Sequence, residues 1–219
     1  VAAPPSTAAT PSLARWQILG PIPVSETGVP GDEAQRRAFD EDQLAACGGE
    51  TRVGVVAGTR CQVGGHDLEW KPLEAAENGV DLGQAVGARD YAIAYAGAEI
   101  QVPAATTVLL GLGSDDAVKV WLNGQRVHSH WIMRGLAPDQ DLVALSLRKG
   151  RNHLLLKVQN GTQAWAFAAR LLDANRLAEP LWLAAKAGDL DRLQTILAHG
   201  QGLALDAQDT PYVSFFVHV

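Results

Sequence analysis

The sequence predicts a mainly β protein, an antiparallel β-sandwich of the jelly-roll kind over residues 16–173, followed by a pair of short helices. Many short apolar segments follow one another after residue 90, and turns rich in Gly and Asn separate them. Asn123–Gly124 lies between two alternating segments, which is typical of a β-hairpin with a type I′ turn. After Ala174 the apolar residues recur at a helical period.

The first residues predict a flexible leader over residues 1–15. Val1–Ser12 consists of Ala, Pro, Ser and Thr after the first valine, and such a composition buries too little apolar surface to order itself. A segment of this kind resembles what remains after a signal peptide is removed. We therefore expect an exported protein, periplasmic or extracellular.

The first predicted strand, Trp16–Pro23, ends at prolines, which favours an edge position in a sheet. Residues 24–46 are expected to form a loop, with a short helix near Asp40–Ala46. The later strands have alternating or continuous apolar patterns and are expected at Tyr91–Ala96, Thr107–Leu112, Leu142–Leu147, His153–Val158 and Ala164–Leu172.

The hairpin around Asn123–Gly124 predicts its own register. Trp121 is expected opposite Arg126, Val120 opposite Val127 and Lys119 opposite His128. The valines would then share one face, whereas Lys119, Trp121, Arg126 and His128 would share the other.

Cys47 and Cys61 are the 2 cysteines of the chain. We predict a disulfide between them, which fits export, and a closed loop of this size adds about 3 kcal/mol to stability. Two unpaired thiols in a cytosolic protein are the alternative. Structural zinc is not expected, because it needs four ligands in paired short spacings.

Composition excludes two classes of partner. The formal net charge is −6, whereas nucleic acids and anionic membranes select clustered Lys and Arg, so we expect neither as the main partner. No apolar run approaches the roughly 20 residues of a membrane-spanning helix.

The segment Pro180–Gly200 resembles an ankyrin repeat. Pro180, Leu181, Ala184 and Ala185 match the opening of the repeat, Gly188–Asp189–Leu190 its middle, and Leu197 and Gly200 its end. Thr210–Pro211 resembles the start of a second repeat, but a β-like tail follows. The resemblance implies a partial ankyrin-like unit over residues 174–219, which contacts a protein partner or a second copy through its apolar stripe (Leu181, Leu190, Leu193, Ile196 and Leu197).

Residues 16–173 resemble the galactose-binding-like β-sandwich accessory domains of exported bacterial proteins. The matching segments are Trp16–Pro21, Gly113–Gly124 and Leu147–Val158. Ser114–Asp115–Asp116 also resembles the protective-antigen-type adhesin domain, in whose lectin members two adjacent aspartates hold calcium. This resemblance implies Asp115 and Asp116 as calcium ligands; the alternative is that they bind local amides and brace the loop.

Ligand contacts are expected on the outer face of the hairpin and beside it. An exposed Trp121 can stack on a sugar while Arg126 donates to hydroxyls, with Asn123 at the tip and Trp131 at the rim of a groove. The alternatives for Trp121 are a cation–π pair with Arg126 or burial under a loop.

The sequence contains no recognisable catalytic motif. His128 and His130 have a spacing that can chelate a transition metal, but without further ligands nearby we interpret the pair as fortuitous. No serine-nucleophile elbow is present.

We therefore expect a non-catalytic exported domain that binds a glycan or another extracellular ligand, with no resident cofactor other than calcium. The alternatives are a structural or assembly module without a small-molecule ligand, and an accessory part of a larger hydrolase.

Overall fold

The computed structural model describes residues 13–52, 54–76, 79–172 and 188–199. The chain divides into two compact units, residues 1–173 and 174–219, and each is considered by itself. In the first unit, the helical elements are α1 (Asp32–Asp40), the 3₁₀ turn η1 (Ala45–Cys47) and α2 (Leu82–Val86). Its strands are β1 (Arg15–Pro23), β2 (Arg60–Val63), β3 (His66–Glu69), β4 (Lys71–Glu74), β5 (Val80–Asp81), β6 (Ala92–Val102), β7 (Thr106–Asp115), β8 (Ala117–Leu122), β9 (Gln125–His130), β10 (Asp141–Leu147), β11 (Gly150–Asn160) and β12 (Ala166–Leu172).

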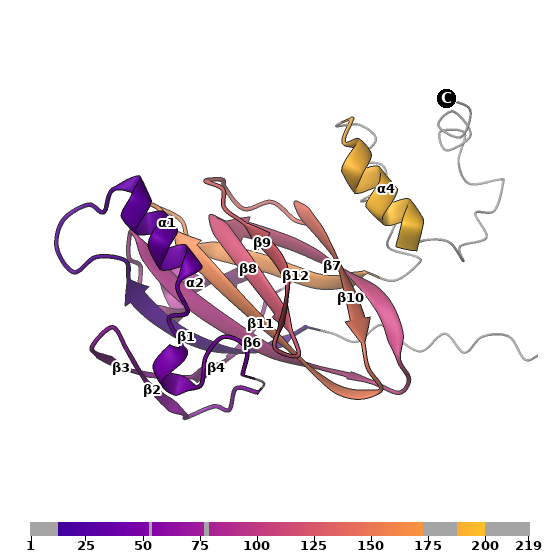
Figure 1. Cartoon of the computed structure of the whole chain (residues 1–219), viewed down its shortest axis with the longest axis horizontal. Helices are drawn as coiled ribbons and strands as arrows, with labels where there is room; N and C mark the ends of the chain where they lie inside the picture. Colours follow the sequence, from indigo (N-terminus) through magenta and orange to yellow (C-terminus); the bar gives the residue numbers. More distant parts are fainter. Residues whose placement is uncertain (1–12, 53, 77–78, 173–187, 200–219) are drawn as a thin grey trace, which may run out of the picture. The chain divides into compact units, whose positions relative to one another are not determined.

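These strands form antiparallel sheets, so the predicted mainly β class is confirmed. The larger sheet has six strands in the order β4-β1-β6-β11-β8-β9, and a second sheet has four in the order β10-β7-β12-β5 (Figure 1). The β2–β3 hairpin is separate. Strand β1 lies between β4 and β6 over Arg15–Ile18, so the expected edge position is wrong for that part; beyond Ile18 the strand pairs with β6 alone, as expected of an edge. Pro21 and Pro23 are tolerated there because no strand pairs with them on the β4 side, and Pro21 also lies where the pairing with β6 shifts register, between Leu19 and Ile22.

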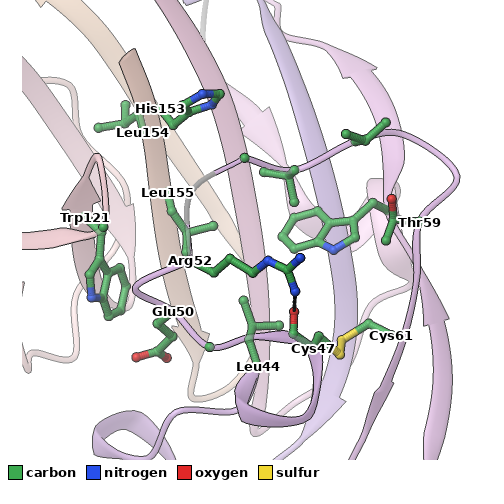
Figure 2. Close-up of a pocket in the computed structure, with 16 residues that line it drawn as sticks. Leu44, Cys47, Glu50, Arg52, Thr59, Cys61, Trp121, His153, Leu154 and Leu155 are labelled. Atoms are coloured by element: carbon green, nitrogen blue, oxygen red, sulfur yellow. Dashed lines mark hydrogen bonds between the residues drawn. A yellow bond between two sulfur atoms is a disulfide. The ribbon is translucent and has the colours of Figure 1, made fainter. Parts of the chain in front are cut away.

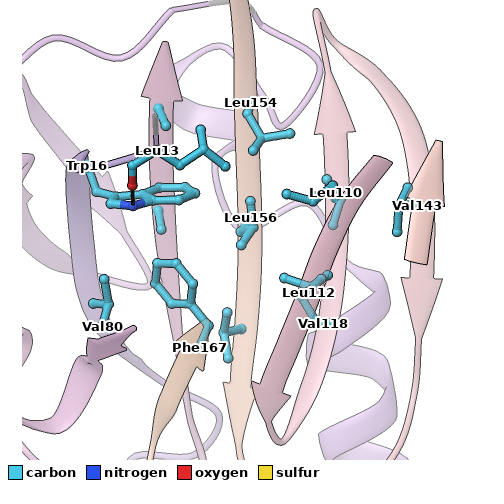
Figure 3. Packing of buried hydrophobic residues seen from close by; sticks show 14 of the residues in the cluster. Leu13, Trp16, Val80, Leu110, Leu112, Val118, Val143, Leu154, Leu156 and Phe167 are labelled. Carbon is cyan, nitrogen blue, oxygen red and sulfur yellow. Dashed lines mark hydrogen bonds between the residues drawn. The ribbon is translucent and has the colours of Figure 1, made fainter. Parts of the chain in front are cut away.

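The main hydrophobic core lies between the two larger sheets. Leu154 and Leu156 of β11 belong to the same buried cluster as Leu110 and Leu112 of β7 (Figure 3). Trp16 of β1 packs edge-on against Phe167 of β12, with ring centroids 4.9 Å apart. Side chains from both sheets therefore interlock, as the packing of a β-sandwich requires.

A second cluster covers the outer face of the six-stranded sheet. Ile93 and Tyr95 of β6 belong to this cluster, whereas Ala94 and Ala96 belong to the main core. Strand β6 is thus buried on both faces, because α1, η1 and the β2–β3 hairpin contribute residues to the outer cluster.

Helix α1 begins earlier than the sequence analysis expected. The helix runs from Asp32 to Asp40, and residues 45–47 form only a 3₁₀ turn, so a helix over Asp40–Ala46 is wrong. Two buried lysines, Lys119 and Lys157, explain where it ends. Both ammonium groups donate to the Phe39 carbonyl at 2.8 Å, and positive charge is favourable at the end of a helix.

In the second unit, the described residues contain the helix α4 (Leu190–His199). Ile196 is buried, but Leu190 is 68% exposed, so the predicted apolar stripe is not covered along its whole length. The first predicted helix, the start of a second repeat and the β-like tail lie outside the described residues.

Candidate functional site

The Asn123–Gly124 turn is confirmed, but the hairpin register changes beyond it. Both turn residues have positive φ, 51° and 83°, as a type I′ turn requires. Trp121 pairs with Arg126 as predicted, but Val120 pairs with His128 rather than Val127. Val127 is therefore the extra residue of a β-bulge, and the predicted pairing of Lys119 with His128 is wrong.

The outer face of the hairpin is covered, not open. Trp121 is 4% exposed and Lys119 is 1% exposed, so the expected exposed indole platform is wrong. Helix α1 covers Lys119, whose ammonium group donates to the Phe39 carbonyl and to Asp40. The loop between η1 and β2 lies beside Trp121 and helps to enclose a cavity of about 240 Å³. We call this cavity the Trp121 pocket.

The Trp121 pocket combines apolar walls with a few charged groups. Trp70, Trp121 and Leu155 line it together with Glu50 and Arg52. The other lining residues are Leu44, Cys47, Gly49, Gly54, Val55, Val56, Thr59, Cys61, Gly124, His153 and Leu154. Figure 2 shows Trp121 on one side and the Cys47–Cys61 disulfide on the other, with the Arg52 side chain between them. Ligand sites typically combine apolar walls with a small number of polar groups in this way.

The predicted disulfide is confirmed and holds one wall of the pocket. Cys47 of η1 is bonded to Cys61 of β2, with their Cα atoms 5.7 Å apart. Arg52 Nη1 donates to the Cys47 carbonyl at 3.4 Å. Val55 of the same loop packs over Gly97 of β6, where a Cβ atom would overlap the valine. The loop can approach the sheet because Gly97 has no side chain.

A buried ionic network fixes Glu50 in the pocket wall. The Tyr95 hydroxyl donates to Glu50 Oε1 at 2.5 Å, and Lys157 Nζ donates to the same oxygen at 3.0 Å. Burial raises the pKa of the Tyr95 hydroxyl well above its ordinary value, and the Glu50 charge raises it further. Burial also lowers the pKa of Lys157, which Glu50 opposes. The Glu50 carboxylate is consequently held in one orientation.

The other predicted ligand contacts lie outside this lining. Asn123 is engaged within the fold, because its side chain donates to Asn152 Oδ1 and accepts from the His153 amide, both at 2.9 Å. Arg126 is exposed on the edge strand β9. Trp131 packs against Phe39 with ring centroids 5.1 Å apart, and Arg36 lies 5.4 Å from its ring. Gly124 is the point where the hairpin tip reaches the pocket.

Asp115 and Asp116 lie where β7 passes into β8. Asp116 Oδ1 accepts the Arg134 amide at 2.8 Å, and its Oδ2 accepts the Gly161 amide at 2.7 Å. Burial and the Asp116 charge raise the pKa of Asp115. Calcium takes about 6–8 oxygen ligands, and this pair offers two carboxylates, of which Asp116 already binds two amides. The alternative, in which the aspartates bind local amides and brace the loop, therefore fits Asp116. Calcium binding stays a prediction.

A third group of side chains joins the two large sheets at one edge of the sandwich. His128 and His130 of β9 lie near Asp141 of β10, and their ligand atoms are all within 4.8 Å of one another. His130 Nδ1 lies 2.9 Å from Asp141 Oδ1, and Arg134 pairs with the same carboxylate. Burial raises the pKa of Asp141, but the neighbouring His128, Arg134 and His130 outweigh it and hold that pKa well below its usual range.

Sequence reasoning missed several of these residues. Glu50 and Arg52 reach the pocket from the loop between η1 and β2, where no periodicity indicates the direction of a side chain. Trp70 lies between β3 and β4, and its segment was expected to be a strand, but the face that it shares with other lining residues was not predicted. Asp141 was missed because it lies 11 residues from His130 in the chain. The two become neighbours only because an edge strand of one sheet, β9, lies near an edge strand of the other, β10. The Asp141–Leu147 strand itself had an alternating pattern that indicated its position.

Comparisons with known proteins give remote structural similarities. No family model and no curated protein matches the sequence. Among solved structures, a β-glucosidase from Kluyveromyces marxianus is 17% identical over 55% of this chain and 16% of its own, with a TM-score of 0.39. The PA14 domain of the antifreeze protein MpAFP is 11% identical over 78% of this chain and 87% of its own, also with a TM-score of 0.39.

A family 35 carbohydrate-binding module from Clostridium thermocellum is 12% identical over 55% of this chain and 84% of its own, with a TM-score of 0.28. A common fold does not follow from TM-scores of this size. The chain spans less than a fifth of the length of the β-glucosidase chain. Among the described helices, none is both long and apolar enough to cross a membrane.

Proposed function

We propose that this chain is an exported, non-catalytic domain that binds a carbohydrate in the Trp121 pocket. The observation that carries the proposal is the composition of the pocket. Trp70 and Trp121, each 4% exposed, contribute apolar wall, whereas Glu50, Arg52 and His153 contribute charged or polar groups. A sugar ring needs both kinds of group, because its C–H faces are apolar and its hydroxyls require hydrogen-bond partners.

The size of the pocket favours a small ligand. Its volume of about 240 Å³ is below the range of about 300–1,000 Å³ that is typical of sites for drug-sized molecules. We propose a single sugar residue as the occupant, with the rest of a glycan leaving over the hairpin tip at Gly124. Asn123, at the tip, and Arg126, beside it, are proposed to contact a longer glycan. Trp131 lies outside the pocket lining and would contact only the part of such a glycan that extends past the pocket.

The Cys47–Cys61 disulfide supports the exported location, because disulfides persist in oxidising compartments. Residues 174–219 are proposed to contact a protein partner, and the 68% exposure of Leu190 supports this. These two parts of the proposal are independent of the pocket.

A glycan array probed with the whole chain tests the proposal. Arrays with and without calcium decide whether the cation contributes through Asp115 and Asp116. Arg52→Ala and His153→Ala remove polar groups from the lining without removing a fully buried side chain. Arg52→Ala should weaken binding of the selected glycan by about tenfold or more, because a hydrogen bond to a charged group contributes about 1.5–3 kcal/mol, and His153→Ala by about two- to tenfold, because an ordinary hydrogen bond contributes about 0.5–1.5 kcal/mol.

Arg151→Ala is the matched control. Arg151 is exposed, lies on the same strand as His153 and pairs with Glu99 outside the pocket. Its removal should leave glycan affinity unchanged. An array that selects no glycan, or a selected glycan whose affinity is the same in Arg52→Ala and His153→Ala as in the wild type, would contradict binding in this pocket.

A further inference from the structure

The edges of the two large sheets meet at three side chains that we call the edge cluster: His128, His130 and Asp141. Strand β9, which carries both histidines, is the last strand of the six-stranded sheet, and β10, which begins at Asp141, is the first strand of the four-stranded sheet. The side chains of Asp141, His128 and His130 are 9%, 22% and 39% exposed. The cluster is thus enclosed on the protein side and open to solvent at its rim.

The β-bulge at Val127 is the reason that the histidines lie here. His128 pairs directly with Val120, and His130 pairs with Val118. Both valines belong to the main core between the sheets, and residues directly opposite each other in an antiparallel pair share a face. The bulge therefore turns both imidazoles from the predicted outer face to the inner face, toward β10.

The distances in the edge cluster suit a small cation. His130 Nδ1 lies 2.9 Å from Asp141 Oδ1, and His128 Nε2 lies 3.6 Å from Asp141 Oδ2. Ligand atoms about 2.0–2.1 Å from a tetrahedral zinc ion are about 3.3 Å from one another, between these two values. The ligand atoms of all three groups lie within 4.8 Å of one another, so side-chain rotations have to bring them closer to reach ligand distance.

One ligand atom lacks a partner. His128 Nε2 is buried, and no described residue forms a hydrogen bond with it. It lies 3.6 Å from Asp141 Oδ2, beyond hydrogen-bond distance, and a buried imidazole nitrogen without a hydrogen bond is unfavourable, which a metal ion would relieve. This nitrogen faces the carboxylate from which a cation would take its third ligand.

Arg134 is placed to support the carboxylate rather than to fill the site. Its Nη2 donates to Ser114 Oγ at 2.8 Å and its Nε donates to the Ser114 carbonyl at 3.3 Å, so the guanidinium is held from the four-stranded sheet. The same group pairs with Asp141. Carboxylates that ligate metals are commonly hydrogen-bonded in this way by a second residue, which fixes their orientation.

We infer that the edge cluster binds a divalent transition-metal ion, of which Zn²⁺ is the representative, through His128, His130 and Asp141. Imidazole and carboxylate ligands suit this class of metal, and three protein ligands leave a fourth position for water. The bound ion joins β9 to β10 and so clips the edges of the two sheets together. This inference does not depend on glycan binding in the Trp121 pocket.

Calorimetric titration of the whole chain, free of any affinity tag, with ZnCl₂ tests the inference. We expect one bound equivalent in the wild type and a rise in melting temperature as Zn²⁺ is added, because a ligand that binds the native state stabilises it. His128→Gln and His130→Gln should each weaken Zn²⁺ binding at least tenfold and abolish the rise. Thermal unfolding without metal shows that both variants are folded.

His66→Gln is the matched control, because His66 also lies beside a carboxylate, 2.6 Å from Glu26, but is outside the edge cluster. Its Zn²⁺ affinity should equal that of the wild type. The inference is overturned if the wild type binds no Zn²⁺ at millimolar concentration. It is equally overturned if the affinity survives unchanged in both His128→Gln and His130→Gln, which would mean that other histidines hold the ion.

Discussion

Reduction of the Cys47–Cys61 disulfide should lower both the stability of the β-sandwich unit and its ability to hold the Trp121 pocket. The two cysteines are 14 residues apart, and closing a loop of that length stabilises the folded state by about 3 kcal/mol in the chain-entropy model. For a unit of this size each kcal/mol shifts the melting temperature by about 2–4 °C. The expected fall on reduction is therefore about 6–12 °C.

The assay compares thermal unfolding of the wild type with and without a reductant, followed by circular dichroism. The double variant Cys47→Ala plus Cys61→Ala is the control, since it contains no disulfide for the reductant to break. Its melting temperature should be low and should not respond to the reductant. Mass spectrometry after alkylation establishes that the wild-type bond was broken under the conditions of the melt.

Reduction of the disulfide should affect the wall of the Trp121 pocket most. Cys61 is 2% exposed and belongs to the outer cluster, whereas the loop that carries Arg52 is exposed. Reduction should consequently weaken glycan binding, because the wall of the pocket is no longer fixed. A reduced wild type that melts within 2 °C of the oxidised protein would refute the loop-closure argument.

Two further perturbations have expected outcomes. Gly113→Ala should destabilise by about 1–3 kcal/mol, measured by urea unfolding, because its Cβ would overlap the Ala137 carbonyl, whereas Gly135→Ala meets nothing within 4 Å and should be neutral. Equal stability of the two variants would contradict that packing. Because the pKa of Tyr95 is raised in the folded state, the contribution of its hydroxyl to stability is fully present below about pH 10, the pKa in the unfolded state. This contribution is lost as the pH rises further, because the phenol of the unfolded chain ionises first. The free energy of unfolding of Tyr95→Phe should fall less steeply above about pH 10 than that of the wild type. At pH 7 the variant should be about 1.5–3 kcal/mol less stable, because the hydrogen bond to Glu50 is lost. Parallel pH profiles of the two proteins would refute this.

The sequence was sufficient for local features of the fold. The Asn123–Gly124 turn and the Trp121–Arg126 pair follow from the steric demands of a type I′ turn, which act over a few residues. The disulfide was predictable because Cys47 and Cys61 had no competing cysteine. Each of these predictions depends on neighbours in the chain or on the number of possible partners.

The predictions that failed depend on packing between distant segments. The edge position of β1 was wrong for Arg15–Ile18, which β4 covers, because the prolines beyond Ile18 say nothing about the pairing of the residues before them. Trp121 was expected to be exposed because alternation indicates two faces but not what covers each of them. The cover comes from α1 and from the loop between η1 and β2, and the loop has no period. Lys119 and Lys157 are buried beneath this cover, where Asp40, Glu50 and the Phe39 carbonyl accept their hydrogen bonds.

The β-bulge at Val127 places the two candidate sites on opposite faces of the same hairpin. In an unbroken two-residue alternation, Trp121 and His128 would lie on the same face, and a ligand on that face would contact both. The extra residue places Trp121 on the outer face of the six-stranded sheet and His128 on the inner face, toward β10. A sugar in the Trp121 pocket and a cation in the edge cluster therefore lie on opposite sides of one sheet and share no ligand atom. Substitutions that remove ligand groups from one site should consequently leave binding at the other unchanged.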